Sequence, residues 1–293
     1  MGIGDDAAVL RAPDGRVAAS TDLLVEGWHF RRDWSSATEI GGKAAAQNLA
    51  DIAAMGAVPT ALLVGLATPG DLPVAWAEDL AAGLAQECSR VGASVAGGDI
   101  SGGPVLMLAV TALGDLGGLP PVTRSGARPG DVLAVAGPLG RSAAGLALLQ
   151  AGLDQPASLL AAHRWPRPDY AAGPEAARLG ATSMIDVSDG LVQDVGHLAG
   201  QSRVRIDLES GLLPPDETLR AAARSTGARD PLDWILTGGE DHALAATFPP
   251  GTALPGRWTV VGRVGDGQGV WVDSRRFERL SGWAHFRGSN APH

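Results

Sequence analysis

The chain has 293 residues, of which 45% are hydrophobic and 19% charged, and its formal net charge is -9 at pH 7. This length is enough for two domains, since single hydrophobic cores rarely grow beyond roughly 250 residues. The acidic balance argues against a nucleic-acid partner and against an anionic membrane, because both are bound through basic patches. If such a protein binds phosphates, a bound metal cation is the obvious mediator.

The cysteine and lysine counts exclude further kinds of site. Cys88 is the only cysteine, so an internal disulfide and a cysteine-based zinc site are excluded. Lys43 is the only lysine, and it lacks the upstream glycine and the following Ser or Thr of a P-loop. The longest apolar runs, 61–67 and 105–113, are far shorter than the ~20 residues of a membrane span, and no signal peptide is recognisable. We therefore expect a cytoplasmic protein.

The amino-terminal half alternates strand-like and helix-like segments. Apolar runs on either side of Pro13-Asp14-Gly15 predict a hairpin, because this tripeptide favours a turn. Ser36 and Glu39 form a capping box, which predicts the start of a helix. The expected elements, in chain order, are strands at 6–10 and 17–24, helices at 36–55 and 71–91, and strands at 94–96 and 105–113.

A stretch rich in Gly, Pro and Ser at 116–128 marks the expected domain boundary. We divide the chain there into an amino-terminal domain, 1–118, and a carboxyl-terminal domain, 119–293. The second domain is expected to contain strands at 131–136, 204–208, 243–248, 259–264 and 270–272 and helices at 141–151, 171–178 and 191–199. Because short turns join several strands, we predict an α+β arrangement in each half rather than one doubly wound sheet.

The placement of the aspartates is the most informative feature of the sequence. Carboxylates rarely enter apolar segments without partners, because an unpaired buried charge is costly. Magnesium prefers oxygen ligands and commonly bridges carboxylates and phosphates, so clustered aspartates favour a magnesium site. Any one of them more often caps a helix or completes a turn, and their number favours metal. The aspartates in question, most of which lie beside Gly, Ser or Thr, are Asp5, Asp6, Asp22, Asp51, Asp99, Asp186 and Asp189.

Other residues suit phosphate binding. Gly97-Gly98 and Gly238-Gly239 allow a close approach of the backbone to a ligand, although glycine pairs usually only turn the chain. Ser188 precedes a predicted helix, whose amino terminus favours an anion. Arg124 is suited to a phosphate contact, although an exposed surface role is the commoner one for arginine.

Seven segments in a fixed order extend almost throughout the chain. They are GIGDDAA at 2–8, STDLLVEGWHF at 20–30, NLADIAAMGA at 48–57, GGD at 97–99, TRSG at 123–126, DVSDGL at 186–191 and GGED at 238–241. In this order and spacing the sequence resembles the thiamine-monophosphate kinase family. That family lies within the superfamily of aminoimidazole ribonucleotide synthetase and selenophosphate synthetase. Ile100 departs from the threonine that usually follows the GGD segment.

The resemblance implies a two-domain aminoimidazole ribonucleotide synthetase-like fold of the α+β class. An amino-terminal mixed sheet would pair in a homodimer, and a carboxyl-terminal α/β sandwich would close the active-site cleft. The implied activity is ATP-dependent phosphorylation of thiamine monophosphate to thiamine diphosphate, with several Mg²⁺ ions. We expect direct in-line transfer, in which the aspartates hold metal rather than form a covalent intermediate.

The resemblance also implies roles for individual residues. Asp51, Asp186 and Asp189 are expected at the catalytic centre. ATP would be positioned by Gly98, Asp99, Arg124 and Ser188. Thiamine monophosphate would be faced by His29, Glu240 and Trp283. The implied metal ligands are Asp6, Ser20, Thr21, Asp22, Asp51, Asp99, Asp186 and Asp189.

The three substrate assignments fit the chemistry of a thiazolium ring, which is a permanent cation. A carboxylate such as Glu240 and an aromatic face such as Trp283 both attract a cation. From the residues alone, Glu240 also fits a surface ion pair, Trp283 a core aromatic and His29 a structural histidine.

Two alternatives remain at the level of the sequence. One is another superfamily member that uses ATP to activate an oxygen or a selenium atom. Selenophosphate synthetases typically carry a cysteine or selenocysteine with a lysine near the amino terminus, and neither is found here. The other is a non-catalytic nucleotide-binding scaffold, which would not need so many metal ligands.

Overall fold

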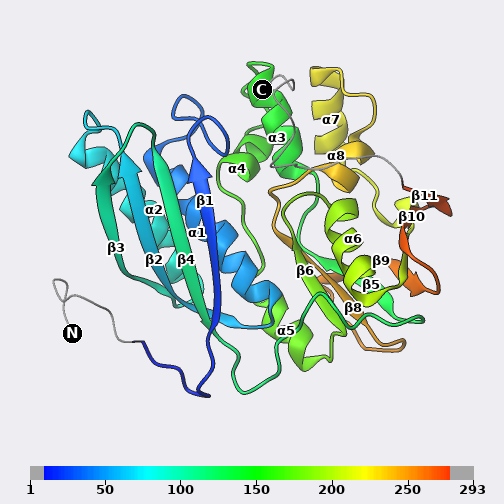
Figure 1. Ribbon diagram of the computed structural model, residues 1–293. Helices are drawn as coiled ribbons and strands as arrows, with labels where there is room; N and C mark the ends of the chain where they lie inside the picture. The colour runs from blue at the N-terminus through cyan, green and yellow to red at the C-terminus, as the bar shows by residue number, and fades with distance from the viewer. Residues whose placement is uncertain (1–9, 278–293) are drawn as a thin grey trace.

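The computed structural model describes residues 10–277 and contains two β-sheets that stand side by side, each with its own helices (Figure 1). The first has the strand order β1-β4-β2-β3 and the second β11-β10-β7-β9-β5-β8-β6. Each sheet mixes parallel and antiparallel neighbours, since β2–β3 and β7–β10 are parallel and the other pairs are antiparallel. The expected α+β fold is confirmed.

The elements of the two sheets follow one another along the chain. Those of the first are β1 (Ala18–Val25), α1 (Ala37–Ala54), β2 (Val58–Thr68), α2 (Val74–Ser89), β3 (Ser94–Gly102) and β4 (Met107–Asp115). Those of the second are β5 (Val132–Ala136), α3 (Arg141–Gln150), α4 (Ala157–Arg164), α5 (Ala172–Arg178), β6 (Ser183–Val187), α6 (Leu191–Ser202), β7 (Arg205–Leu208), η1 (Ser210–Leu212), α7 (Glu217–Thr226), α8 (Pro231–Thr237), β8 (Ala243–Phe248), β9 (Trp258–Gly265), β10 (Gly269–Val272) and β11 (Arg275–Arg276).

Helix α1 is the central element, because it packs against the first sheet, against α2 and against β6 of the second sheet. Its predicted capping box is confirmed, with the Ser36 amide donating to Glu39 Oε2 at 2.8 Å and the Glu39 amide donating to Ser36 Oγ at 3.3 Å. Gly41 brings α1 against α2, since a Cβ at this position would lie 2.1 Å from the Leu80 carbonyl oxygen. The two helices therefore touch backbone to backbone.

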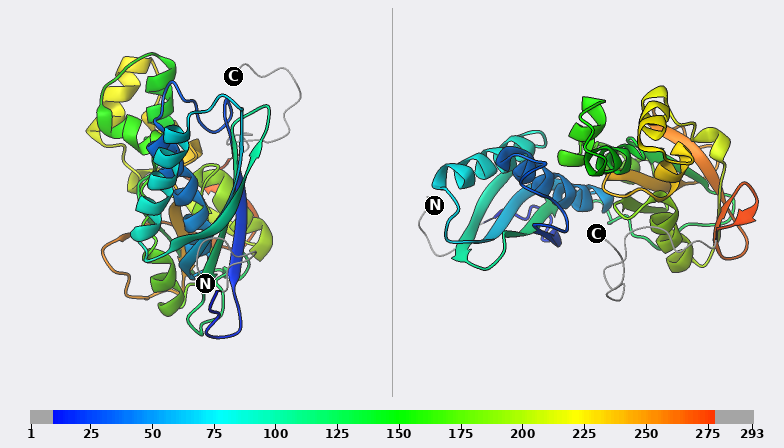
Figure 2. Two further views of the ribbon diagram at one scale, coloured as in Figure 1. Left: turned by 90° about the vertical axis from the view of Figure 1, so that its left-hand side faces the viewer. Right: turned by 90° about the horizontal axis from the view of Figure 1, so that it is seen from above.

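Both α1 and α2 lie on one face of the first sheet, and no helix within residues 10–277 covers the other face (Figure 2). Side chains alternate along β1, so Ser20 and Asp22 point toward α1 while Thr21 and Leu23 point to the uncovered face. Leu23 is 53% exposed and Leu63, on β2, is 37% exposed. We call this surface the open sheet face.

Several elements differ from those expected. Strand β1 pairs with β4, and the partner predicted at 6–10 lies almost wholly outside the described residues. Strand β3 continues to Gly102, so Gly97-Gly98 lies within an edge strand rather than in a turn. The described elements that the sequence pattern missed are β2, β6, β11, α4, α7, α8 and the short η1.

A buried carboxylate on α2 joins the two halves. Glu87 is fully buried and accepts hydrogen bonds from Trp165 Nε1 at 2.7 Å and Tyr170 Oη at 2.6 Å. Arg167 donates to the same carboxylate at 2.9 Å, and Arg90, which caps the carboxyl end of α2, also pairs with it. These donors fix α2 to the segment that follows α4. We call this group the Glu87 cluster.

One hydrophobic core cluster is shared between the halves, running from Leu24 and Ile40 to Phe248 and Trp258. A second cluster lies within the carboxyl-terminal half. Within residues 10–277, no helix combines the length and the apolar character that a bilayer crossing requires.

Candidate functional site

One wall of the candidate site is formed where β1 packs on α1. Ser20 Oγ donates to Asp51 Oδ2 at 2.7 Å, and the Gln47 amide nitrogen donates to Asp22 Oδ2 at 3.1 Å. The fully buried Asn48 accepts the Asp22 backbone amide at 3.2 Å and donates to the Ala44 carbonyl oxygen at 2.8 Å. A polar face of α1 thus fixes the residues of β1 that were predicted as metal ligands.

The opposite wall is the loop that leads from β6 into α6. Asp186, at the end of β6, is 4% exposed, and its Oδ2 lies 3.2 Å from His242 Nδ1. Asp194 Oδ2 accepts the backbone amides of Asp189 and Gly190, both at 3.0 Å. Gln193 donates to Asp189 Oδ2 at 3.1 Å. The loop is therefore held by side chains of the helix that it opens.

The two walls face each other across the junction of the halves. Burial, followed by the charges of Asp186 and Asp22, raises the pKa of Asp51 to about 7. Burial, followed by the charge of Asp186, raises the pKa of Asp194 to about 8. For His242 burial lowers the pKa, but the hydrogen bond and the charge of Asp186 outweigh it, so the net shift is upward. His242 alone does not balance the negative charge of these carboxylates.

The chemistry of this donor set fits a magnesium ion. Its carboxylate and hydroxyl oxygens are the ligands that Mg²⁺ prefers, and a cation would remove the repulsion that raises the pKa of Asp51. Within residues 10–277, no three side chains of His, Cys, Asp or Glu lie close enough together to hold a metal on their own. Water, hydroxyl or phosphate oxygens would have to complete any coordination sphere.

Two of the predicted metal ligands lie away from Asp51. Thr21 Oγ1 donates to the Val110 carbonyl oxygen at 3.0 Å and accepts from Thr111 at 3.1 Å on the open sheet face. Asp99 lies on edge strand β3, with β2 and β4 between it and β1, so about 14 Å separates the two strands. Asp99 is paired with Gly65, two residues beyond Leu63, which places it on the open sheet face. Asp6 is outside the described residues.

The residues predicted for ATP are also dispersed. Gly98 lies next to Asp99 on β3, where a Cβ would lie 2.0 Å from the Val64 carbonyl oxygen, so packing between strands alone requires glycine. The Ser188 carbonyl oxygen accepts the Glu240 amide at 2.8 Å, which places Ser188 at the site. The Arg124 carbonyl oxygen accepts from Ser202 at 3.3 Å. Arg124 therefore lies at the opposite end of α6 from Ser188, about 18 Å away along the helix.

The structure brings His29 and Glu240 together. Lys43, on α1, donates to the His29 carbonyl oxygen at 2.9 Å and pairs with Glu240 Oε1 at 3.0 Å. Glu240 Oε2 lies 3.4 Å from His163 Nδ1. Burial raises the pKa of Glu240, but Lys43 and then His163 lower it more strongly, and the result is about 2. Trp283 lies outside the described residues.

The sequence analysis did not single out several residues that build this site. Most of them support predicted residues that lie far away in sequence, so only the fold reveals them. Asp241 could have been found from the sequence, because it follows Glu240 in the GGED segment. Its carboxylate accepts the amides of Gly140 at 2.5 Å and Ser142 at 2.8 Å, which ties the GGED segment to the start of α3. The others are Lys43, Gln47, Asn48, His163, Gln193, Asp194 and His242.

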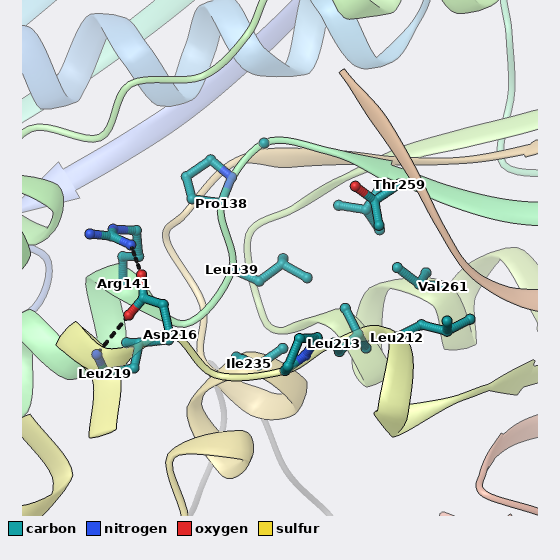
Figure 3. Close-up of a pocket in the computed structure, with 13 residues that line it drawn as sticks. Pro138, Leu139, Arg141, Leu212, Leu213, Asp216, Leu219, Ile235, Thr259 and Val261 are labelled. Atoms are coloured by element: carbon teal, nitrogen blue, oxygen red, sulfur yellow. Dashed lines mark hydrogen bonds and ion pairs between the residues drawn. The ribbon is translucent and has the colours of Figure 1, made fainter. Parts of the chain in front are cut away.

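A separate open pocket of about 240 Å³ lies in the carboxyl-terminal half (Figure 3). Its lining is mainly apolar, including Leu139, Leu213 and Ile235, and contains none of the predicted site residues. Figure 3 shows Arg141 and Asp216 paired at its edge, and their nearest atoms are 2.7 Å apart. Asp216 also caps α7 by accepting the Leu219 amide at 2.8 Å. The polar atoms at this edge are thus already engaged.

Comparison with known proteins gives consistent results. The family model for the AIR synthase related protein, N-terminal domain, matches residues 4–116. The chain is 48% identical over 287 residues to the thiamine-monophosphate kinase of Mycobacterium tuberculosis (strain ATCC 25618 / H37Rv), covering 98% of this chain and 86% of that protein. It is 40% identical over 258 residues to the thiamine-monophosphate kinase of Escherichia coli (strain K12), covering 85% and 76%.

Solved structures show the same likeness. The thiamine monophosphate kinase of Aquifex aeolicus superposes with a TM-score of 0.85 at 34% identity, covering 92% of this chain and 91% of that chain. A structure of AaThiL complexed with AMPPCP and TMP gives a TM-score of 0.86 at 34% identity, covering 92% and 87%. The hydrogenase maturation protein HypE in complex with ATP, at 18% identity and a TM-score of 0.73, shares the fold.

Proposed function

This chain belongs to the thiamine-monophosphate kinase family, and we propose that it transfers the γ-phosphate of ATP to thiamine monophosphate to give thiamine diphosphate. The observation that supports this proposal most directly is the proximity of Asp51 to Asp186. These carboxylates come from different halves of the molecule, and the charge of Asp186 adds to the burial that raises the pKa of Asp51. An acidic site of this kind can accept phosphates only together with metal.

We propose that Asp22, Asp51, Asp186 and Asp189, with the hydroxyl of Ser20, hold Mg²⁺ in this site. When bound, Mg²⁺ would neutralise the carboxylates and the phosphates and stabilise the charge that develops during transfer. Asn48, Gln47 and Gln193 would keep the carboxylates oriented through the hydrogen bonds described above. Asp194 would hold the Asp189 loop in the conformation that faces Asp51.

The proposed reaction is a direct in-line transfer. A phosphate oxygen of thiamine monophosphate forms a bond to the γ-phosphorus of ATP while the bond to the bridging oxygen breaks and ADP leaves. The attacking phosphate oxygen is already ionised near neutral pH, so no strong general base is required. His29, Glu240 and Trp283 are proposed to face thiamine monophosphate, and Ser188, Gly98 and Arg124 to contact ATP.

We further propose that a second copy of the chain covers the open sheet face. Exposed Leu23 and Leu63 form an apolar surface there, which supports an interface. Thr21 and Asp99 lie on the same face, away from Asp51 in their own chain. In a homodimer they would lie at the junction of two protomers, where ATP and its metal ions would gather.

The decisive experiment is a product assay with purified protein, ATP, Mg²⁺ and thiamine monophosphate. We expect ADP and thiamine diphosphate in equal amounts, with no product from free thiamine and none in the presence of EDTA. The expected location of this reaction is the cytoplasm. A folded protein that binds ATP but forms no thiamine diphosphate would contradict the proposal and favour another activity of the superfamily or a scaffold.

A further inference from the structure

Lys43 occupies an unusual position for a lysine. It is the only lysine of the chain, and it is 2% exposed. Its ammonium donates to the His29 carbonyl oxygen at 2.9 Å and pairs with the Glu240 carboxylate at 3.0 Å. His29 follows β1 in the amino-terminal half, whereas Glu240 precedes β8 in the carboxyl-terminal half. One side chain thus binds a residue from each half.

Burying this ammonium is costly. Removing a cation from water carries an effective penalty of several kcal/mol, and a buried ion pair often does no better than a well-packed apolar pair. The neighbouring residue Gly42 packs directly on Trp165, since a Cβ at Gly42 would lie 1.9 Å from the Trp165 ring. The amino-terminal part of α1 therefore packs against the carboxyl-terminal half, and the Lys43 ammonium is held there by His29 and Glu240.

Both partners of Lys43 are themselves anchored. The His29 ring accepts the Val25 amide at 3.0 Å, and the Gly27 amide donates to the Phe30 carbonyl oxygen at 2.8 Å, which closes the loop after β1. Glu240 has a φ of 64°, a left-handed conformation that costs energy outside glycine. Its amide donates to the Ser188 carbonyl oxygen at 2.8 Å. The ammonium therefore links two preformed loops.

We propose that Lys43 is a positioning residue for thiamine monophosphate, fixing the His29 loop against the Glu240 carboxylate so that the two halves present one substrate site. The inference rests on the proposed function, since it takes His29 and Glu240 as the residues that face this substrate. Lys43 balances the charge of Glu240. Recognition of thiamine monophosphate therefore depends on the fixed arrangement of the two loops rather than on a net negative charge. Loosening either loop would weaken binding of thiamine monophosphate and leave the ATP-binding elements in place.

The test is the substitution Lys43→Met, which keeps an unbranched side chain, shorter by one atom, and removes its charge. We expect the KM for thiamine monophosphate to rise by at least about tenfold, which corresponds to 1.4 kcal/mol of binding. The KM for ATP and kcat at saturation should change by less than about threefold, since the lost contact acts on substrate binding. Equilibrium binding of thiamine monophosphate without ATP should weaken by the same factor as the KM rises.

The matched control is Glu87→Gln, which also removes a buried charge between the halves but lies in the Glu87 cluster. We expect it to lower the melting temperature and leave both KM values unchanged. If Lys43→Met alters both KM values alike, or if Glu87→Gln raises the KM for thiamine monophosphate equally, Lys43 is only structural and the inference is wrong.

A second comparison tests whether Lys43 acts through Glu240. The changes Lys43→Met and Glu240→Gln should be strongly non-additive, so that the double variant binds thiamine monophosphate no more weakly than the worse single variant. Additive effects would overturn the inference. If the wild-type protein makes product and the KM of Lys43→Met for thiamine monophosphate is unchanged, only this inference is contradicted. A wild-type protein that makes no product overturns the proposed function and this inference with it.

Discussion

Asp51 is the residue on which the charge of the site converges. It is buried, it faces Asp22 and Asp186, and the hydroxyl of the neutral Ser20 donates a hydrogen bond to it. An ionised carboxylate in this place is unfavourable without a cation. Function and stability therefore make opposite demands at this position, as is common for residues that await a ligand.

The substitution Asp51→Asn tests the effect of this carboxylate on activity and on stability separately. We expect kinase activity to fall by at least about 100-fold, the scale on which a group that stabilises transition-state charge acts. In EDTA the melting temperature should rise, because a neutral amide relieves the repulsion with Asp186. Activity and thermal unfolding, measured beside the variant Asp79→Asn at an exposed position of α2, check both effects. Preserved activity, or a lower melting temperature in EDTA, would contradict the placement of Asp51.

His163 makes the stability of the protein sensitive to mild acid. Burial, and then the charges of Lys43 and Arg164, lower its pKa to about 4 from an ordinary value of 6.5, although Glu240 acts the other way. The unfolded chain therefore binds a proton below pH 6.5 while the folded protein does not. This contribution is complete above pH 6.5 and is lost as the pH falls to about 4.

The size of this effect is about 3 kcal/mol at most, given 1.36 kcal/mol per pKa unit. We expect the free energy of unfolding of the wild type to fall between pH 6.5 and pH 4 relative to that of His163→Gln. The difference between the two proteins isolates His163 from carboxylates that respond in the opposite direction, such as Asp241, whose pKa burial raises to about 7. Parallel pH profiles would show that His163 is not buried as a neutral ring.

At the level of single residues, the sequence predicts the aspartates of the site but not the residues that support them. Asp22, Asp51 and Asp186 were predicted from their apolar surroundings, and the structure brings them together. Lys43 was considered only as a possible P-loop lysine, because its partners lie 14 and 197 residues away in sequence. Sequence spacing carries no information about contacts of that range.

Among the elements, the helices with clear end signals were the easiest to predict. The capping box at Ser36 determined the start of α1, because its two hydrogen bonds are local. Strand β6 was missed because all five of its residues are buried, so it has no alternation of polar and apolar side chains. Strand β3 was predicted too short, because glycines that suggest a turn also allow close packing of neighbouring strands.

The Glu87 cluster gives α2 a role beyond covering the sheet. We expect Glu87→Gln to lower the free energy of unfolding by about 2 kcal/mol, because Tyr170 and Trp165 lose a charged acceptor. Chemical denaturation would measure this, with Glu78→Gln on the same helix as a control near zero. A change below a few tenths of a kcal/mol would mean that the cluster adds nothing to the junction of the halves.

For the whole molecule, the fold class followed from the resemblance of seven motifs rather than from periodicity. Local patterns predicted strands and helices, but the order β1-β4-β2-β3 places next to each other strands that are far apart in sequence. That order explains why Thr21 and Asp99 share the open sheet face while Ser20 and Asp22 face α1. The division of the predicted metal ligands between two faces could not be read from spacing.

The substitution Leu63→Glu tests the proposed homodimer. Leu63 is already exposed, so the monomer should remain folded, whereas a buried carboxylate in an apolar interface would prevent association. Light scattering after size-exclusion chromatography should show dimers for the wild type and monomers for the variant. Val74→Glu, at a 75% exposed position on α2, should remain dimeric. A monomeric wild type would contradict the pairing of these sheets.

The single buried lysine has a practical consequence. Reagents that acylate amines have two kinds of target in this chain, the α-amino group and the Lys43 side chain, and the second is closed to solvent. Brief treatment should therefore attach one label per molecule. Slow appearance of a second label would report how often the contact between the halves opens, and a ligand that holds the halves together would delay it. The chain thus carries its own probe of the contact between its two halves.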